Sequence, residues 1–202
     1  MKRRECRRQR IKGLISRRFL KRDKGNAEWL MGMFFLLLLA ILLCMQLEIS
    51  LYATAGASLE DALAASNLAS AIVDLEEYGT THVVRIADFR TAYERYRQAV
   101  QGNLGLDEDW EASGLGVIAG RVRVVKYSIY NVTEENVTVW DMDEEGGVTV
   151  RQEHLGSVYA PSGQKIEHTS VYSEIAFPVR GLFGMETEAH KGKLVDIVAA
   201  AE

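Results

Sequence analysis

An uninterrupted apolar run near the N-terminus constrains this 202-residue chain more than any other feature. Residues 29–47, WLMGMFFLLLLAILLCMQL, are 19 positions without a single charge. As a helix rising about 1.5 Å per residue, the run would be about 28 Å long, close to the thickness of a bilayer's hydrocarbon core. Its leucines, phenylalanines and isoleucine favour membrane insertion by roughly 3 to 6 kcal/mol. We therefore predict a transmembrane helix over residues 26–48.

Charge is distributed unequally on the two sides of this run. Residues 1–24 contain 12 of the 24 lysines and arginines but only Glu5 and Asp23 as acids, whereas the whole chain has a formal charge of −4. The positive-inside rule places such a flank in the cytoplasm. We expect residues 1–25 to be a basic cytoplasmic leader and the C-terminal domain to be extracytoplasmic, in a single-pass protein of the cell membrane.

The basic cluster of the leader resembles a site for nucleic-acid phosphates, because such binding needs only clustered Lys and Arg. Its position directly before a membrane helix favours a topology signal in contact with anionic lipid instead. We therefore expect membrane lipid, and no nucleic acid, as a partner of this segment.

A removed secretory signal is the alternative to an anchor, because Ala53, Ala55 and Ala57 form A-x-A patterns beyond the run. The run is longer than the usual h-region of about 7 to 15 residues, and no proline separates it from the residues after it. An anchor is therefore favoured. Cys6 lies in the leader and Cys44 in the membrane run, so the outer domain is expected to fold without disulfides.

Helical periodicity continues beyond the membrane run as an amphipathic stem over residues 49–79. Glu60, Asn67 and Asp74 lie on one side of this helix, and small or apolar residues lie on the other. We expect the apolar stripe to pack against the protein's own domain or against neighbouring subunits, and the helix to continue to about Tyr78. The stripe consists of Leu51, Ala55, Ala62, Ala65, Ala69 and Val73.

The pattern changes within the outer domain, residues 80–202. A short amphipathic helix is predicted over residues 86–100 and a glycine-rich loop over 102–116. Segments rich in Val, Ile, Thr and Tyr then predict a meander of four or five antiparallel strands. The fold class is α+β: a long N-terminal transmembrane helix with an amphipathic stem packed on a small antiparallel sheet. The predicted strands are 117–132, 136–141, 148–154, 165–179 and 187–198.

Residues suited to chemistry do not form a recognisable constellation. The four histidines are scattered, and the glycines of segment 114–120 lack the lysine of a phosphate loop. Acids at 141–145 offer oxygen ligands for calcium without EF-hand spacing, so a solvated turn is expected. Asn131 and Asn136 begin Asn-x-Thr triplets, which accept glycans only in a cell with that machinery. We expect no enzyme, no catalytic residue, no metal and no cofactor.

A family resemblance is visible at the junction of leader and membrane run, where Gly25, Asn26, Ala27, Glu28 and Trp29 succeed one another. This order differs from a standard secretory signal and resembles the class III leader of type IV pilins. The chain as a whole is similar to the TadE-type pseudopilins of the tight-adherence (Tad/Flp) pilus system. The similarity includes the late segment EIAFPVRGLFG, with Pro178 and a turn between Gly181 and Gly184, followed by a final strand.

The resemblance implies a pilin-like fold and a role as a minor subunit of a bacterial type IV-like pilus or secretion filament. A prepilin peptidase would cut after Gly25 and leave Asn26 as the new N-terminus. Other pilin-like subunits and the pilus assembly machinery would be partners. The alternative function is a stand-alone, membrane-anchored extracellular binding or sensor domain.

The resemblance also gives Glu28 and Trp29 the places of the acid and the aromatic residue at the family's helix start, where they would set helix registration. The family has its glutamate at the fifth position after the cut, whereas Glu28 would be third. A carboxylate at the inner membrane edge is stabilised by pairing with the amino terminus of a neighbouring subunit. Alternatively, Glu28 caps the helix N-terminus near the headgroups.

Overall fold

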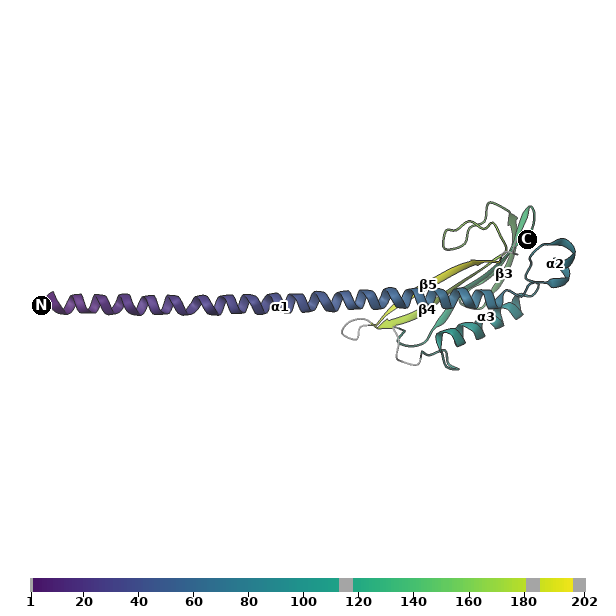
Figure 1. Ribbon diagram of the computed structural model, residues 1–202. Helices are drawn as coiled ribbons and strands as arrows, with labels where there is room; N and C mark the ends of the chain where they lie inside the picture. Colours follow the sequence, from purple (N-terminus) through teal and green to yellow (C-terminus); the bar gives the residue numbers. More distant parts are fainter. Residues whose placement is uncertain (1, 113–117, 181–185, 198–202) are drawn as a thin grey trace. The chain divides into compact units, whose positions relative to one another are not determined.

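The computed structural model describes residues 2–112, 118–180 and 186–197, with side chains from Ala27 onward. Two compact units divide the chain, Met1–Ser50 and Leu51–Glu202. The elements in chain order (Figure 1) are α1 (Lys2–Ser70), α2 (Leu75–Thr81), α3 (Phe89–Leu104), β1 (Arg123–Val132), β2 (Asn136–Met142), β3 (Val148–His154), β4 (Ser170–Arg180) and β5 (Glu186–Asp196).

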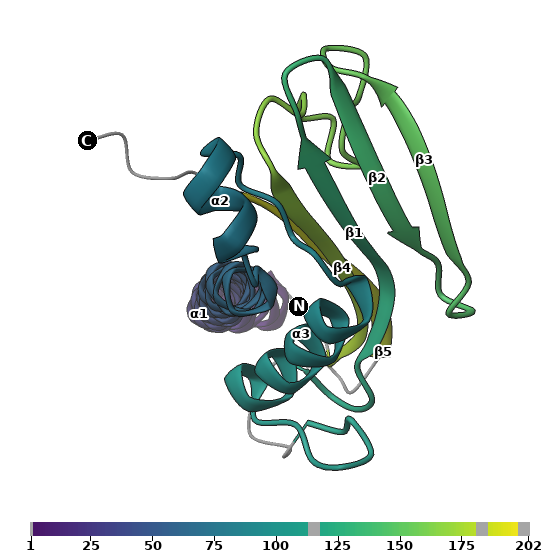
Figure 2. The same ribbon diagram turned by 90° about the vertical axis from the view of Figure 1, so that its right-hand side faces the viewer.

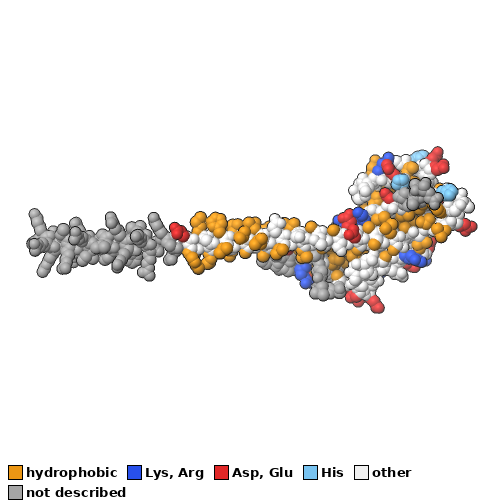
Figure 3. All heavy atoms as spheres, viewed as in Figure 1, with side chains coloured by type: hydrophobic (Ala, Val, Ile, Leu, Met, Phe, Trp, Pro, Cys, Tyr) orange, Lys and Arg blue, Asp and Glu red, His pale blue; other side chains and the backbone are white. Residues whose placement is uncertain are grey.

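The first unit consists of helical backbone belonging to α1. Its large apolar side chains are exposed, from 41% at Leu38 to 72% at Leu47, and hydrophobic groups gather along it in Figure 3. Within the described residues, one helical stretch, Ala27–Ser70, is long and apolar enough to cross a membrane. A helix with apolar side chains on all sides is stable only when lipid or protein surrounds it.

The second unit confirms the α+β class. Its five strands form one antiparallel sheet in the order β3-β2-β1-β4-β5, and the last turns of α1 lie with α3 over one face (Figure 2). The predicted meander is correct for β1, β2 and β3 and for the pair β4 and β5, and it is wrong only at the connection from β3 to β4. After β3 the chain crosses the sheet to pair β4 with β1, because Val158, Ala160 and Ile166 of the crossing segment cover the second face.

Aromatic side chains dominate the core between α3 and the sheet. Tyr96 of α3 lies on Tyr127 of β1 with ring centroids 4.8 Å apart, and Phe89 contacts Trp140 of β2 edge to face. Offset and edge-to-face pairs of this kind are favourable beyond the area they bury. The apolar residues that recur every three or four positions along α3 are therefore the residues that contact the sheet.

The bounds of α3 differ from the predicted 86–100 because its caps lie elsewhere. The Asp88 carboxylate accepts hydrogen bonds from the backbone N–H groups of Arg90 and Thr91, and Gly105 closes the helix with a φ of +63°. The first residues of the expected loop are thus helical, and Ile86 forms a bridge with Val73 instead. The remaining expected loop and the first predicted strand fall partly on residues 113–117, outside the described part, and so does the turn between Gly181 and Gly184.

The stem ends earlier than its periodicity predicts. α1 stops at Ser70, and the chain is extended where Val73 pairs with Ile86. The backbone N–H of Asp74 donates to the carbonyl of Arg85 at 2.9 Å, and the Asp74 carboxylate then caps α2. Pairing with residues 85–86 therefore interrupts the predicted helix at residues 71–74, and helical backbone resumes in α2 at Leu75.

The face of the stem that packs on the sheet is also different from the predicted alanine stripe, because the stem's polar side chains find partners in the interior. Ala65 and Ala69 are exposed. The Asn67 amide, fully buried, donates to the backbone carbonyls of Lys193 at 2.9 Å and Val171 at 3.4 Å. A buried polar group costs little once it is hydrogen-bonded. The buried face consists of Leu59, Leu63, Ser66, Asn67 and Ser70.

Two polar side chains fix the segment between α2 and α3 to the sheet. Asn131 of β1, only 3% exposed, accepts from the backbone N–H of Ile86 at 2.9 Å and donates to its carbonyl at 3.0 Å. The Thr169 hydroxyl donates to the carbonyl of Val84 at 2.7 Å. Asn131 is therefore unsuited to a glycan, which needs an asparagine at the surface.

The buried face of the stem is tested by two leucines of α1. We expect Leu63→Ala to lower the free energy of unfolding by about 2 to 5 kcal/mol, because it leaves a cavity in the core. Leu68, 54% exposed on the same helix, is the matched control, and Leu68→Ala should change stability by less than about 0.5 kcal/mol. Urea unfolding followed by tryptophan fluorescence measures both, and equal effects would contradict the packing described.

We call the two hydrogen bonds between the Asn131 side chain and the backbone of Ile86 the Asn131 clamp. The two asparagines of the Asn-x-Thr triplets test it. Asn131→Ala leaves the buried N–H and C=O of Ile86 without partners, so we expect a loss of about 2 to 4 kcal/mol. Asn136→Ala is the control, because the Asn136 side chain is half-buried at the start of β2, and its loss should be clearly smaller. Thermal unfolding of the two variants side by side distinguishes them; similar melting temperatures would show that the clamp carries no stability.

Candidate functional site

The residues predicted for leader processing and helix registration all lie on α1. Gly25 and Asn26 have helical backbone, and their side chains lie outside the described part. Glu28 and Trp29 are exposed on the first unit, Trp29 by 70%. Because α1 begins at Lys2, Glu28 is far from the helix start in the uncut chain. An N-terminal cap at Glu28 therefore requires a helix shortened to begin near residue 26, since the helix dipole acts within the first turn.

Glu28 has a distinctive local surface. It lies with Trp29, Gly32 and Leu36 along a shallow hollow on the helix, which we call the Glu28 hollow. Gly32 creates the hollow, because a side chain added there would meet nothing within 4 Å. The arrangement places a carboxylate one turn before a gap in an otherwise bulky apolar surface. Another backbone or amino group can approach the carboxylate closely at this point.

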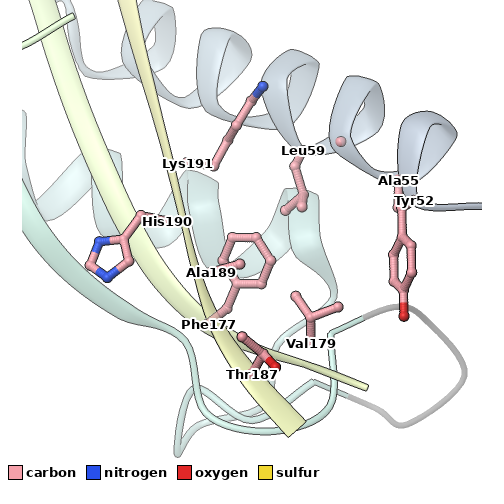
Figure 4. Close-up of a pocket in the computed structure, with 10 residues that line it drawn as sticks. Tyr52, Ala55, Leu59, Phe177, Val179, Thr187, Ala189, His190 and Lys191 are labelled. Carbon is pink, nitrogen blue, oxygen red and sulfur yellow. The ribbon is translucent and has the colours of Figure 1, made fainter. Parts of the chain in front are cut away.

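The second unit contains a hollow of its own, which we call the stem groove (Figure 4). It has a volume of about 470 Å³ and lies between α1 and the strands β4 and β5. Leu59 points from the helix toward Phe177 and Val179 of the sheet, and Tyr52 extends from the helix at one end of the groove. The lining is mostly apolar and comprises Tyr52, Ala55, Gly56, Leu59, Phe177, Val179, Thr187, Ala189, His190 and Lys191.

Small residues keep the stem groove open. Ala55 and Gly56 of the helix line the groove together with Thr187 and Ala189 of β5, and a side chain added at Gly56 would meet nothing within 4 Å. The Tyr52 hydroxyl spans the open end by donating to the carbonyl of Arg180 at 2.9 Å. The groove was not predicted from the sequence. The signal available was the small pair Ala55 and Gly56 in the stem, which is informative only once its sheet partners are known.

Charged groups join the stem to β5 beside the groove. Glu60 accepts from the ammonium of Lys193 at 2.8 Å and lies 3.1 Å from that of Lys191. Hydrogen bonds first from Lys193 and then from Lys191 lower the pKa of Glu60 below its ordinary value. The two ion pairs connect the stem to β5 at this point.

The acidic segment predicted as a solvated turn is only partly one. Asp141 is buried in β2, where it accepts from the Ser128 hydroxyl and pairs with Arg151 of β3. Asp143 accepts from the backbone N–H of Gly147 at 2.7 Å and shapes the hairpin. Within the described residues, no group of three or more His, Cys, Asp or Glu is arranged to hold a metal ion. These carboxylates serve the hairpin itself.

Tyrosines are the titratable groups with strongly shifted pKa values in this unit. Burial raises the pKa of Tyr96 and of Tyr127, and the Tyr127 hydroxyl donates to Ser70 at the end of α1. Burial also raises the pKa of Tyr130, to about 12. All three phenols are neutral at physiological pH, and among the described residues the buried Tyr96 hydroxyl has no hydrogen-bond partner.

No protein-family model, curated protein or solved structure matches this chain. A function must therefore be inferred from the structure itself, that is, from the length of α1 and from two hollows on its surface. These are the Glu28 hollow and the stem groove, and both are made by glycine within a helix, Gly32 in one and Gly56 in the other.

The pH dependence of stability tests the contact of Glu60 with the lysines. Because its folded-state pKa is lowered, the stabilisation is present above the ordinary glutamate pKa of about 4.3 and is lost as the pH falls through the folded-state value. We expect Glu60→Gln to lower the urea midpoint at pH 7, with a difference from the wild type that disappears in acid. Asp61→Asn, at an exposed neighbour, is the control. A difference that persists unchanged at a pH of about 3 would contradict the assignment.

Proposed function

We propose that this protein is a pilin-like minor subunit of a type IV-like, Tad-type pilus or secretion filament, without enzymatic activity, and that α1 is the element through which it assembles. The observation that carries the proposal is the double role of α1. One part presents apolar side chains on every side, and a later part of the same helix, from Leu59 to Ser70, is core of an α+β unit.

A simple membrane anchor has no need of this construction. About 20 apolar residues and a flexible linker hold a domain at a bilayer. Here Leu59, Leu63 and Asn67 of the helix are buried against the sheet, and Glu60 is paired with lysines of β5. The domain is built around the helix, as expected for a subunit whose helix must be held firmly when it passes from lipid into an assembly.

The Glu28 hollow supports helix registration in such an assembly. After a cut at Gly25, the α-amino group of Asn26 would be available to a carboxylate on a neighbouring subunit. A carboxylate in apolar surroundings is stabilised only by a partner, and Glu28 has no ion pair among the side chains that the structure describes. Gly32 leaves space for the approach of that partner.

The proposed topology follows from charge. The basic leader is cytoplasmic, the apolar run spans the membrane, and the second unit is extracytoplasmic. The partners in this proposal are membrane lipid, a prepilin peptidase, other pilin-like subunits and the pilus assembly machinery.

The stem groove favours a second candidate function. An apolar hollow of about 470 Å³ falls within the size range of small-ligand sites, and it needs no other subunit to be complete. A stand-alone, membrane-anchored binding or sensor domain would use the groove and keep its leader intact.

Processing of the leader distinguishes the two candidates. We expect mass spectrometry of the protein isolated from its own membranes to find an N-terminus at Asn26. Gly25→Trp should abolish processing, because a peptidase subsite for glycine excludes a bulky side chain. Gly13→Trp, at the other glycine of the leader, is the control and should be processed normally.

The same preparations show the assembly state. Co-purification of the processed chain with other pilin-like subunits supports the proposal. An intact Met1 in a chain isolated alone favours the sensor, and an N-terminus at Gly56 or Ser58 would contradict both candidates, because it removes the membrane run.

A further inference from the structure

We propose that the free edge of β3 pairs with β3 of a second copy of this chain, in antiparallel orientation, so that two five-stranded sheets join into one. Neither candidate function above includes this contact. β3 is the last strand of the sheet, and Figure 2 shows it at the outer edge, away from α1 and α3. Six of its seven residues are exposed.

β3 has few of the features that usually protect an edge strand: it has no proline and no bulge, and its charged side chains Arg151 and Glu153 pair with each other. Its pairing with β2 runs without a register shift from Val148 to His154. The strand, VTVRQEH, contains no proline and no lysine. Natural edge strands are commonly blocked by proline, by lysine or by a bulge, because a regular exposed edge is a template for another strand.

The hairpin geometry shows which backbone groups point outward. The Asp143 N–H donates to the carbonyl of Gly147 at 3.1 Å, so this pair is hydrogen-bonded, and bonded pairs recur at every second residue of an antiparallel ladder. Thr149, Arg151 and Glu153 therefore bond to β2. The N–H and C=O groups of Val148, Val150 and Gln152 point away from β2, toward the position of a sixth strand.

Apolar side chains accompany these outward groups on one face. Val148 is 49% and Val150 is 64% exposed. Val150 lies opposite Trp140, which contacts Phe89 of α3. The helix covers Trp140 only in part and leaves the two valines in solvent. A strand added at this edge would extend the core at the point where α3 stops covering it.

The hydrogen bond already made by the carbonyl of His154 limits the register of the pair. A twofold axis through Val150 places the two Val150 side chains opposite each other, Val148 opposite Gln152 and Thr149 opposite Arg151. An axis through Arg151 would place Val148 opposite His154 and would use the carbonyl of His154, which already accepts from Ser157. An axis through Gln152 would need the same carbonyl. The axis through Val150 gives about six backbone hydrogen bonds without this conflict.

A second copy fits this edge better than an unrelated strand. Arg151 is already neutralised by Asp141 and Glu153, so the edge offers no excess charge to select a charged peptide. The interface is small, below the roughly 1,200 Å² of a stable soluble complex. Copies held in one bilayer by residues 29–47 gain effective concentration, which makes such a weak contact sufficient.

Disulfide trapping in membranes tests the pairing. In the full chain with Cys6→Ser and Cys44→Ser, we expect Val150→Cys to form a dimer under mild oxidation, at least about 10-fold more than Gln152→Cys, because only position 150 faces itself across the axis. Chains with Val148→Cys and with Gln152→Cys, expressed together, should form a mixed dimer. Equal trapping at 150 and 152, or a product with a different protein, would overturn the proposal.

A backbone variant provides the second test. Val150→Pro removes an N–H that points away from β2, so the fold should be retained, while the central bonds of the pair are lost. We expect dimer recovery by chemical crosslinking in membranes to fall at least about 10-fold. Val150→Thr keeps the N–H and should dimerise as the wild type does. Unchanged crosslinking of Val150→Pro, with a normal melting temperature, would refute pairing through β3. Gly25→Trp should leave trapping at position 150 unchanged, so this test is independent of leader processing.

Discussion

The structure of the second unit depends on the burial of one face of α1 against the sheet. Leu63 is fully buried there, and it lies in the same core as Tyr96 and Tyr127. An antiparallel sheet of this size needs a cover on its apolar face, and the last turns of a helix that also carries the apolar run supply part of it. Leu59 and Leu63 of α1 are therefore part of the domain's core.

Polar side chains decide where this cover begins and ends. Asn67 satisfies two carbonyl groups of the sheet from inside the interface, and Glu60 meets two lysines at its border. Asn131 captures the backbone of Ile86, which in turn pairs with Val73. The pairing of Val73 with Ile86 explains why α1 ends at Ser70, because Val73 must have extended backbone to pair. Hydrogen bonds with directional requirements therefore set the boundaries, whereas apolar burial supplies the driving force.

The sequence was sufficient for features that depend on neighbouring residues. The apolar run, the segment 148–154 and the periodicity of α3 follow from local composition, and each agrees with the structure. The packing face of the stem could not be predicted in the same way, because periodicity counts alanine as buried and asparagine as exposed. Asn67 reverses that rule through carbonyl groups of residues more than 100 positions away. The crossing from β3 to β4 and the stem groove could not be predicted for the same reason, since each is defined by contacts between distant strands.

Two glycines illustrate how this helix combines stability with open surface. A glycine in a helix costs about 1 kcal/mol relative to alanine, yet Gly32 and Gly56 both stand in α1 with free space where a side chain would be. Neither position requires glycine for its backbone, because both have ordinary helical conformation. Local folding therefore favours alanine at both sites. Each of the two lines a hollow: Gly32 lies beside Glu28 in an apolar surface, and Gly56 forms part of the wall of the stem groove. Both are positions where another molecule can come close to the helix backbone.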